Sequence, residues 1–103
     1  MKKVTAILIG AGNRGAEAYA SYALSFPEEL SFVGVAEPRL EHREEFKTKH
    51  KIDEKYSVST WEELLNFPKF ADLVLICTQD TMHIAPMMKA MEKGYDILVE
   101  KPI

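Results

Sequence analysis

Three glycines near the start of the chain, Gly10, Gly12 and Gly15, have the spacing G-x-G-x-x-G. They follow a short apolar run, Val4–Ile9, and precede a helical stretch rich in alanine and tyrosine. After a buried strand, such glycines permit a sharp turn, a close approach of the backbone to a pyrophosphate, and tight packing of the helix on the strand. The unpaired N–H groups and the positive dipole end of that helix then face the phosphates. The motif predicts a dinucleotide-binding turn, although a glycine turn without a ligand has the same local sequence.

Other polar side chains could add to this site. Asn13 and Arg14 lie at the tip of the turn, from which they can reach a phosphate. Glu37 follows the second apolar run, 31–36, near the separation of about 20 residues expected for an acid that binds the adenosine ribose. Such a carboxylate accepts hydrogen bonds from both ribose hydroxyls and repels a 2′-phosphate, which favours NAD over NADP. Arg39 favours NADP instead, because its guanidinium could pair with a 2′-phosphate. The alternative interpretation of Glu37 is an acid exposed to solvent in a turn.

The composition is that of a globular domain outside the membrane. The 103 residues suffice for one small domain with a core, and 47% hydrophobic and 28% charged residues are ordinary for that class. The net charge of −3 argues against a general nucleic-acid or acidic-membrane binder. The chain has a single cysteine, Cys77, which excludes an internal disulfide and suits a reducing compartment. Because Cys77 lies inside an apolar run, we predict that it is a small buried residue. No apolar run reaches the roughly 18 residues of a membrane span, and the basic start before Val4–Ile9 is too weak a signal-peptide pattern, so we expect a cytoplasmic chain.

Apolar runs alternate with helical stretches along the whole chain. Strands are predicted at 4–9, 31–36, 56–59, 72–77 and 95–99. Helices are predicted at 13–25, 38–50 and 83–93, with one more after Thr60, where Thr60 and Glu63 form a capping box. Pro38 is well placed to begin the second helix, and Gly94 to end the last.

The second helix, 38–50, is mostly charged, so we expect it on the outside. Few of its side chains can face the sheet: Leu40 and Phe46, with the stems of Arg43 and Lys47. His42 and His50 have no partners at metal-ligand spacing and are predicted to be surface histidines, so we expect no metal site.

The alternation of strands and helices predicts an α/β fold, a doubly wound parallel sheet with helices on both faces. The expected strand order is 3-2-1-4-5, which places the ligand crevice at the carboxyl ends of strands 1 and 4. All candidate residues follow strand ends on that edge. They are the glycine motif, Glu37, the segment from Thr78 to His83, and Lys101.

Four motifs together make the sequence recognisable: Gly10-Ala11-Gly12-Asn13-Arg14-Gly15, Ala36-Glu37-Pro38, Cys77-Thr78-Gln79-Asp80-Thr81-Met82-His83 and Glu100-Lys101-Pro102. Over essentially its whole length the chain resembles the Rossmann-like domain of the Gfo/Idh/MocA oxidoreductases. These are NAD(P)-dependent dehydrogenases that act mostly on sugars, inositols and related polyols. The glycine motif is shared with many enzymes, whereas E-K-P after the fifth strand is the specific part. The family more often has Pro-Asn where this chain has Gln79-Asp80, a departure that concerns local contacts and not the fold.

The resemblance implies roles for the residues near the nicotinamide. Thr78, Gln79 and His83 would border the nicotinamide half of the cofactor, with His83 either facing the crevice or packed at the start of a helix. Glu100 would contact a cofactor ribose. Lys101 would be the active-site lysine, which takes the hydroxyl proton while hydride leaves the alcohol carbon.

The resemblance also implies a longer protein, because the family continues past E-K-P into a sheet domain with the substrate pocket. We expect residues 1–103 to be the dinucleotide-binding domain of a homo-oligomeric enzyme for a small sugar or polyol. The bond between Lys101 and Pro102 would be cis, as it often is in the family. Two alternatives stay open: an NAD-dependent glycosidase of the same family, and a non-catalytic module that senses NAD(H) or scaffolds a partner. The lysine at 101 argues against the second, since a sensor needs no proton-transfer group.

Overall fold

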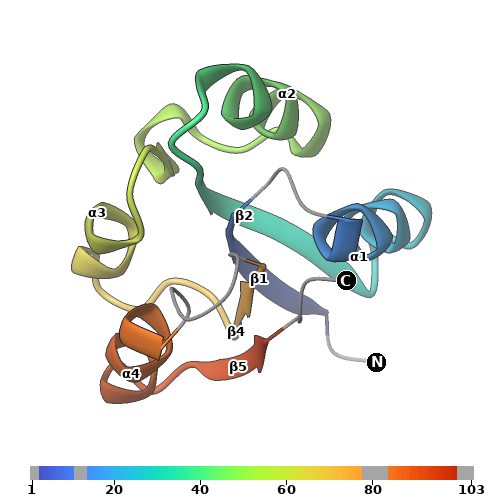
Figure 1. Ribbon diagram of the computed structural model, residues 1–103. Coiled ribbons are helices and arrows are strands. Elements are labelled where there is room, and N and C mark those ends of the chain that lie inside the picture. Colours follow the sequence, from blue (N-terminus) through green and yellow to red (C-terminus); the bar gives the residue numbers. More distant parts are fainter. Residues whose placement is uncertain (1–2, 11–13, 78–83, 100–103) are drawn as a thin grey trace.

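The computed structural model describes residues 3–10, 14–77 and 84–99. Five parallel strands form one sheet in the order β3-β2-β1-β4-β5, which confirms the predicted order (Figure 1). The strands are β1 (Val4–Ile9), β2 (Leu30–Ala36), β3 (Ser57–Val58), β4 (Leu73–Ile76) and β5 (Asp96–Val99). The helices are α1 (Arg14–Ser25), α2 (Leu40–His50), α3 (Trp61–Asn66) and α4 (Ile84–Glu92), with a 3₁₀ turn, η1 (Glu54–Tyr56), before β3.

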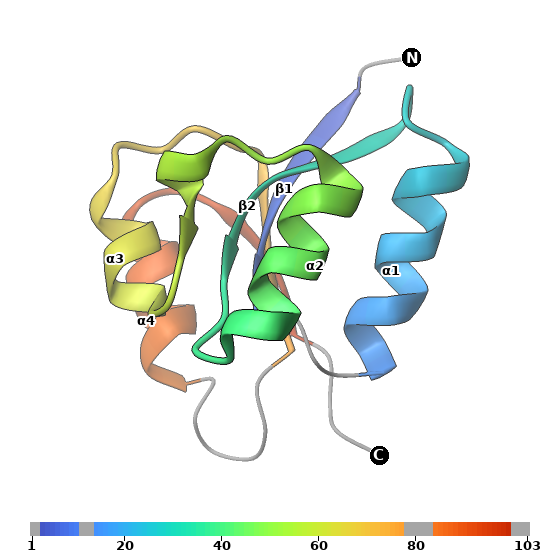
Figure 2. The same cartoon turned by 90° about the horizontal axis from the view of Figure 1, so that it is seen from above.

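The helices cover both faces of the sheet. Figures 1 and 2 show α1 and α2 on one side of the strands and α3 and α4 on the other. Along β1, Ala6 and Leu8 belong to the core beneath α1 and α2, while Ile7 and Ile9 belong to the core beneath α3 and α4. All four are buried. A central parallel strand that is buried on both faces is apolar along its whole length, so the apolar run Val4–Ile9 was sufficient to predict β1.

The start of α2 differs from the prediction. The helix begins at Leu40 and not at Pro38. Arg39 is extended, with φ −80° and ψ 114°, and its backbone N–H donates to the Glu37 carboxylate at 2.8 Å. Arg39 is the N-cap, and its carbonyl accepts the first hydrogen bond of the helix from the N–H of Arg43 at 3.0 Å. The prediction that Leu40 faces the sheet is wrong, because its side chain is exposed and Phe46 is the buried residue of the helix.

His50, the last residue of α2, is half-buried against two core aromatic rings, so the prediction of a surface histidine is wrong there. Its ring stacks on Phe46, with centroids 4.2 Å apart, and meets Phe32 edge-on at 5.3 Å. Its Nε2 atom is buried without a hydrogen-bond partner. Burial, with a smaller contribution from Lys49, lowers the pKa of His50 to about 4.

The two later helices begin and end close to their predicted positions. The Thr60 hydroxyl accepts a hydrogen bond from the backbone N–H of Glu63 at 3.2 Å, which caps α3. The Glu63 carboxylate accepts from the hydroxyls of Ser59 and Thr60 in place of the backbone donor of a standard capping box. Gly94 lies just beyond α4. In the part of the chain that the structure describes, no helix has both the length and the apolar character needed to cross a membrane.

Candidate functional site

The carboxyl ends of β1, β2 and β4 meet at one edge of the sheet. Ile9 pairs with the last residue of β2 and with the last residue of β4. The backbone N–H of Gly10 donates to the carbonyl of Ala36 at 2.9 Å, and the N–H of Cys77 donates to the carbonyl of Ile9 at 2.8 Å. The residues that follow these three strands, including Glu37, therefore lie next to one another, as predicted for the described part of the edge.

Gly10, directly after β1, has a backbone conformation that suits the sharp turn predicted by the glycine motif. Gly10 has φ +93°, a left-handed conformation that glycine adopts without strain. The first helix begins at Arg14, and Gly15 is its second residue. Strand β1 and helix α1 therefore lie on either side of the glycine motif, as predicted. Gly12 and Asn13 lie outside the described residues.

Glu37 is the buried acid of this edge, with 1% of its surface exposed. Its backbone N–H donates to the carbonyl of Val58 in β3 at 3.0 Å, and its own carbonyl accepts from Nη1 of Arg43 in α2 at 2.9 Å. The alternative of a solvated turn acid is therefore wrong. Burial of a carboxylate costs free energy unless hydrogen bonds or an opposite charge compensate it. The groups that bind the Glu37 carboxylate therefore determine which ligand groups it can accept.

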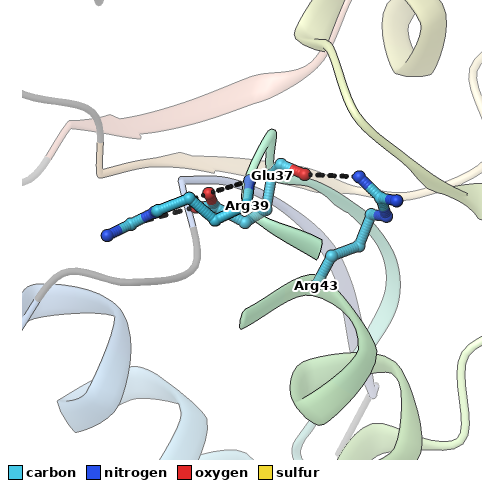
Figure 3. A network of polar contacts seen from close by, with 3 residues as sticks. All are labelled: Glu37, Arg39 and Arg43. Atoms are coloured by element: carbon cyan, nitrogen blue, oxygen red, sulfur yellow. Dashed lines mark hydrogen bonds and ion pairs between the residues drawn. The ribbon is translucent and has the colours of Figure 1, made fainter. Parts of the chain in front are cut away.

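Arg39 compensates the Glu37 carboxylate (Figure 3). Its backbone N–H and its Nε donate to Oε2 at 2.8 and 2.9 Å, and its Nη2 donates to Oε1 at 3.3 Å. The hydrogen bond to Glu37 raises the pKa of the Arg39 guanidinium above its ordinary value, so the cation is permanent. The Arg39 side chain is 58% exposed against 2% for that of Glu37. The Glu37 carboxylate is therefore fixed inside the fold, whereas the Arg39 guanidinium borders solvent.

The sequence reasoning missed the part that Arg43 plays. It treated Arg43 as a side chain whose stem covers the sheet, whereas the guanidinium holds the backbone carbonyl of Glu37 (Figure 3). The available signal was its position four residues after Arg39, since residues at that spacing lie on the same face of a helix. Arg39, just before α2, and Arg43, in its first turn, both reach the end of β2.

The residues expected near the nicotinamide lie outside the described residues: Thr78, Gln79, His83, Glu100 and Lys101, with its bond to Pro102. Cys77, just before them, is 2% exposed, which confirms the prediction of a small buried residue. Among the described residues, no group of three or more histidine, cysteine, aspartate or glutamate side chains could hold a metal ion.

A family model described as "Oxidoreductase family, NAD-binding Rossmann fold" (GFO_IDH_MocA) matches residues 4–103. No curated protein sequence matches the chain.

Solved structures share the fold. An oxidoreductase from Sinorhizobium meliloti has a TM-score of 0.76 and 16% identity, over 96% of this chain and 29% of that protein. An aldose-aldose oxidoreductase from Caulobacter crescentus, solved with glycerol, has a TM-score of 0.74 and 17% identity, over 94% of this chain and 29% of that protein. RSP, a Rex-family repressor, has a TM-score of 0.69 and 20% identity, over 99% of this chain and 47% of that protein. At these identities the likeness concerns the fold alone.

Proposed function

The chain belongs to the Gfo/Idh/MocA oxidoreductase family, and we propose that it binds the cofactor for an enzyme that transfers hydride between a sugar- or polyol-type secondary alcohol and a nicotinamide. The observation that carries the proposal is the buried carboxylate of Glu37 beside the Gly10 turn, at the carboxyl edge of a parallel sheet. In doubly wound sheets, ligands bind at this edge, where the strand order reverses.

Glu37 supports NAD as the preferred nucleotide. An ionised carboxylate only accepts hydrogen bonds, and the two ribose hydroxyls of adenosine can both donate. A 2′-phosphate would bring a second negative charge against an acid that is 1% exposed, where water screens the repulsion poorly. NADP is therefore the second choice, and its binding depends on Arg39.

The residues at the nicotinamide end have roles proposed from their motifs. A nicotinamide held at this edge would supply the hydride chemistry, Lys101 would take the proton of the substrate hydroxyl, and Glu100 would hold a cofactor ribose. Thr78, Gln79 and His83 border the nicotinamide.

The chain spans 29% of the length of the two oxidoreductases to which it is compared. We propose that a further domain supplies the substrate pocket and that the complete protein is a cytoplasmic homo-oligomer without nucleic-acid or membrane partners.

The test is a calorimetric titration of the protein with NAD and, separately, with NADP. Glu37→Ala should weaken NAD binding about tenfold or more, because hydrogen bonds to a charged group are lost. Glu41→Ala removes the same charge from an exposed position on α2 and is the matched control. Equal NAD affinity in the Glu37 variant and the wild type would refute the ribose site, and no binding of either nucleotide to the folded wild type would refute the proposed function.

Two other functions compete with the dehydrogenase. A glycosidase of the same family would oxidise and then reduce its substrate, so it would produce no net NADH, whereas a dehydrogenase accumulates NADH with a polyol. A non-catalytic nucleotide-responsive or scaffold module is the second candidate, supported by the same fold in a protein named as a repressor. Such a module would bind the nucleotide without any turnover.

A further inference from the structure

We propose that two copies of this chain associate through the outer edge of β5 and the adjoining apolar flank of α4. Their sheets would join into one, and their α4 helices would pack antiparallel across a twofold axis. The surface consists of Ile97 and Val99 of β5 with Ile84, Met88 and Met91 of α4. The inference names a contact surface for the proposed homo-oligomer and is independent of the nucleotide site.

One flank of α4 is apolar and exposed. Ile84, Met88 and Met91 are 51%, 61% and 63% exposed. They are four and then three residues apart in the sequence, so they form one seam, like the a and d positions of a coiled coil. Pro86 and Ala90 are the buried residues of the helix. The helix therefore has a second apolar surface besides the one that packs on the sheet.

This seam lies on the flank of α4 that faces away from α3, its neighbour on the same face of the sheet (Figure 1). The N–H of Lys93 donates to the carbonyl of Lys89, so the backbone continues the helix as far as Lys93. Nζ of Lys93 donates to the carbonyl of Phe67, just after α3, at 3.0 Å. Ile84 and Lys93 are about two and a half turns apart, so they point to opposite flanks. The seam therefore points toward the margin of the sheet at β5.

β5 is an outer strand of the described sheet, because among the described strands it pairs with β4 alone. The N–H of Asp96 donates to the carbonyl of Asp72 at 3.1 Å. Residues of a parallel strand bond alternately to its two sides, so the N–H and carbonyl groups of Ile97 and Val99 point away from β4. Residues 97–99 include no proline and no charge. Such an edge is a template for pairing with another strand.

One twofold axis can serve both contacts. In an antiparallel pair of β5 strands, Ile97 of each copy exchanges hydrogen bonds with Val99 of the other, around Leu98 at the axis. The paired strands are about 4.8 Å apart. Because α4 packs on both β4 and β5, its axis lies about half a strand spacing inside β5. The two α4 axes are then about 10 Å apart, which is within the usual range for packed helices.

The seam is self-complementary across that axis. In antiparallel helices, Ile84 of one copy faces Met91 of the other, and Met88 lies near the axis. All three side chains of the seam are apolar, so covering them buries no charge. They contribute roughly 300 Å² per copy, less than the about 800 Å² per partner of a stable interface. The strand edge must therefore contribute as well, and we expect a dissociation constant on the order of micromolar.

The experiment is sedimentation velocity of the 103-residue chain over a concentration series that brackets the micromolar range. The mass should rise with concentration from the 11.7 kDa of one chain toward twice that value. Met91→Glu places a charge against Ile84 of the other copy and should raise the dissociation constant about tenfold or more. Leu24→Glu is the matched control, because Leu24 is 50% exposed and lies on α1, on the other face of the sheet. It should leave the dissociation constant unchanged.

Hydrogen exchange tests the strand contact separately. The amides of Ile97 and Val99 should exchange more slowly as the protein concentration rises, because they become paired only in the dimer. The amide of Leu98 points toward β4 and should be protected at every concentration, which makes it the internal control. In Met91→Glu, the amides of Ile97 and Val99 should exchange as they do in the dilute wild type.

Three results would overturn the proposal. The first is a folded wild type that stays monomeric throughout the series, and the second is a dimer whose dissociation constant does not change in Met91→Glu. The third is equal protection of the Ile97 and Val99 amides at all concentrations, which would mean that residues of the same chain cover this edge. If Met91→Glu does not fold, Ile84→Glu makes the same test from the other end of the seam. No nucleotide is present in these measurements, so their failure leaves the proposed function untouched.

Discussion

His50 should make the stability of the domain depend on pH in mildly acidic solution. In the folded chain its pKa is lowered to about 4, chiefly by burial, from the 6.5 of an exposed histidine. The unfolded chain therefore binds the proton more readily between these two values. Stability should consequently fall as the pH falls below about 6.5 and should level off below about 4.

The magnitude follows from the pKa difference. A shift from 6.5 to about 4 corresponds to a maximum of about 3 kcal/mol, and to about 2 kcal/mol at about pH 5. The physical cause is that a charged imidazole stacked on Phe46 and next to Phe32 would lose much of its hydration. Such a loss is a large fraction of the stability of a small domain.

The assay is urea unfolding of the wild type and of His50→Phe at about pH 8 and about pH 5. Phenylalanine keeps the flat ring, and Nε2 of His50 has no hydrogen-bond partner to lose. The loss of stability between the two pH values should be smaller in the variant by about 2 kcal/mol, with equal m-values. An equal loss in both proteins would refute the reasoning, because the buried imidazole would then not resist protonation.

Two further predictions concern the core and the reaction. Gly34→Ala should destabilise the domain by about 1–3 kcal/mol in the same urea assay, because a Cβ at Gly34 would lie 2.9 Å from Ile7 Cγ2 and 3.0 Å from Phe70 Cζ; a variant as stable as the wild type would show that these side chains move apart freely. In the complete protein, Lys101→Ala should abolish NADH production from a polyol and leave the NAD dissociation constant unchanged, and surviving turnover would show that Lys101 is not the base.

The strand order could be predicted because the strongest signals in the sequence are local. The run from Val4 to Ile9 is apolar at nearly every position, as a central strand between two helical layers requires. The glycine turn follows it directly, and Gly10 has the positive φ that only glycine adopts readily. Alternation of strands and helices then leaves few topologies.

The face and the start of α2 could not be predicted in the same way. Its sequence has few apolar residues, so hydrophobic spacing does not distinguish exposed Leu40 from buried Phe46. His50 is buried by aromatic contacts with residues distant in the sequence, such as Phe32. Just before the helix start, the Arg39 N–H donates to the Glu37 carboxylate, a contact between a side chain and the backbone that hydrophobic patterns do not encode.

Glu37 therefore connects the fold to the site. Its backbone contacts β3 through Val58 and α2 through Arg43, while its carboxylate accepts from the backbone N–H of Arg39, the N-cap residue of α2. A change of the Glu37 side chain would therefore remove the charged partner of Arg39, whereas the contacts with Val58 and Arg43 are made by the Glu37 backbone and do not need its carboxylate.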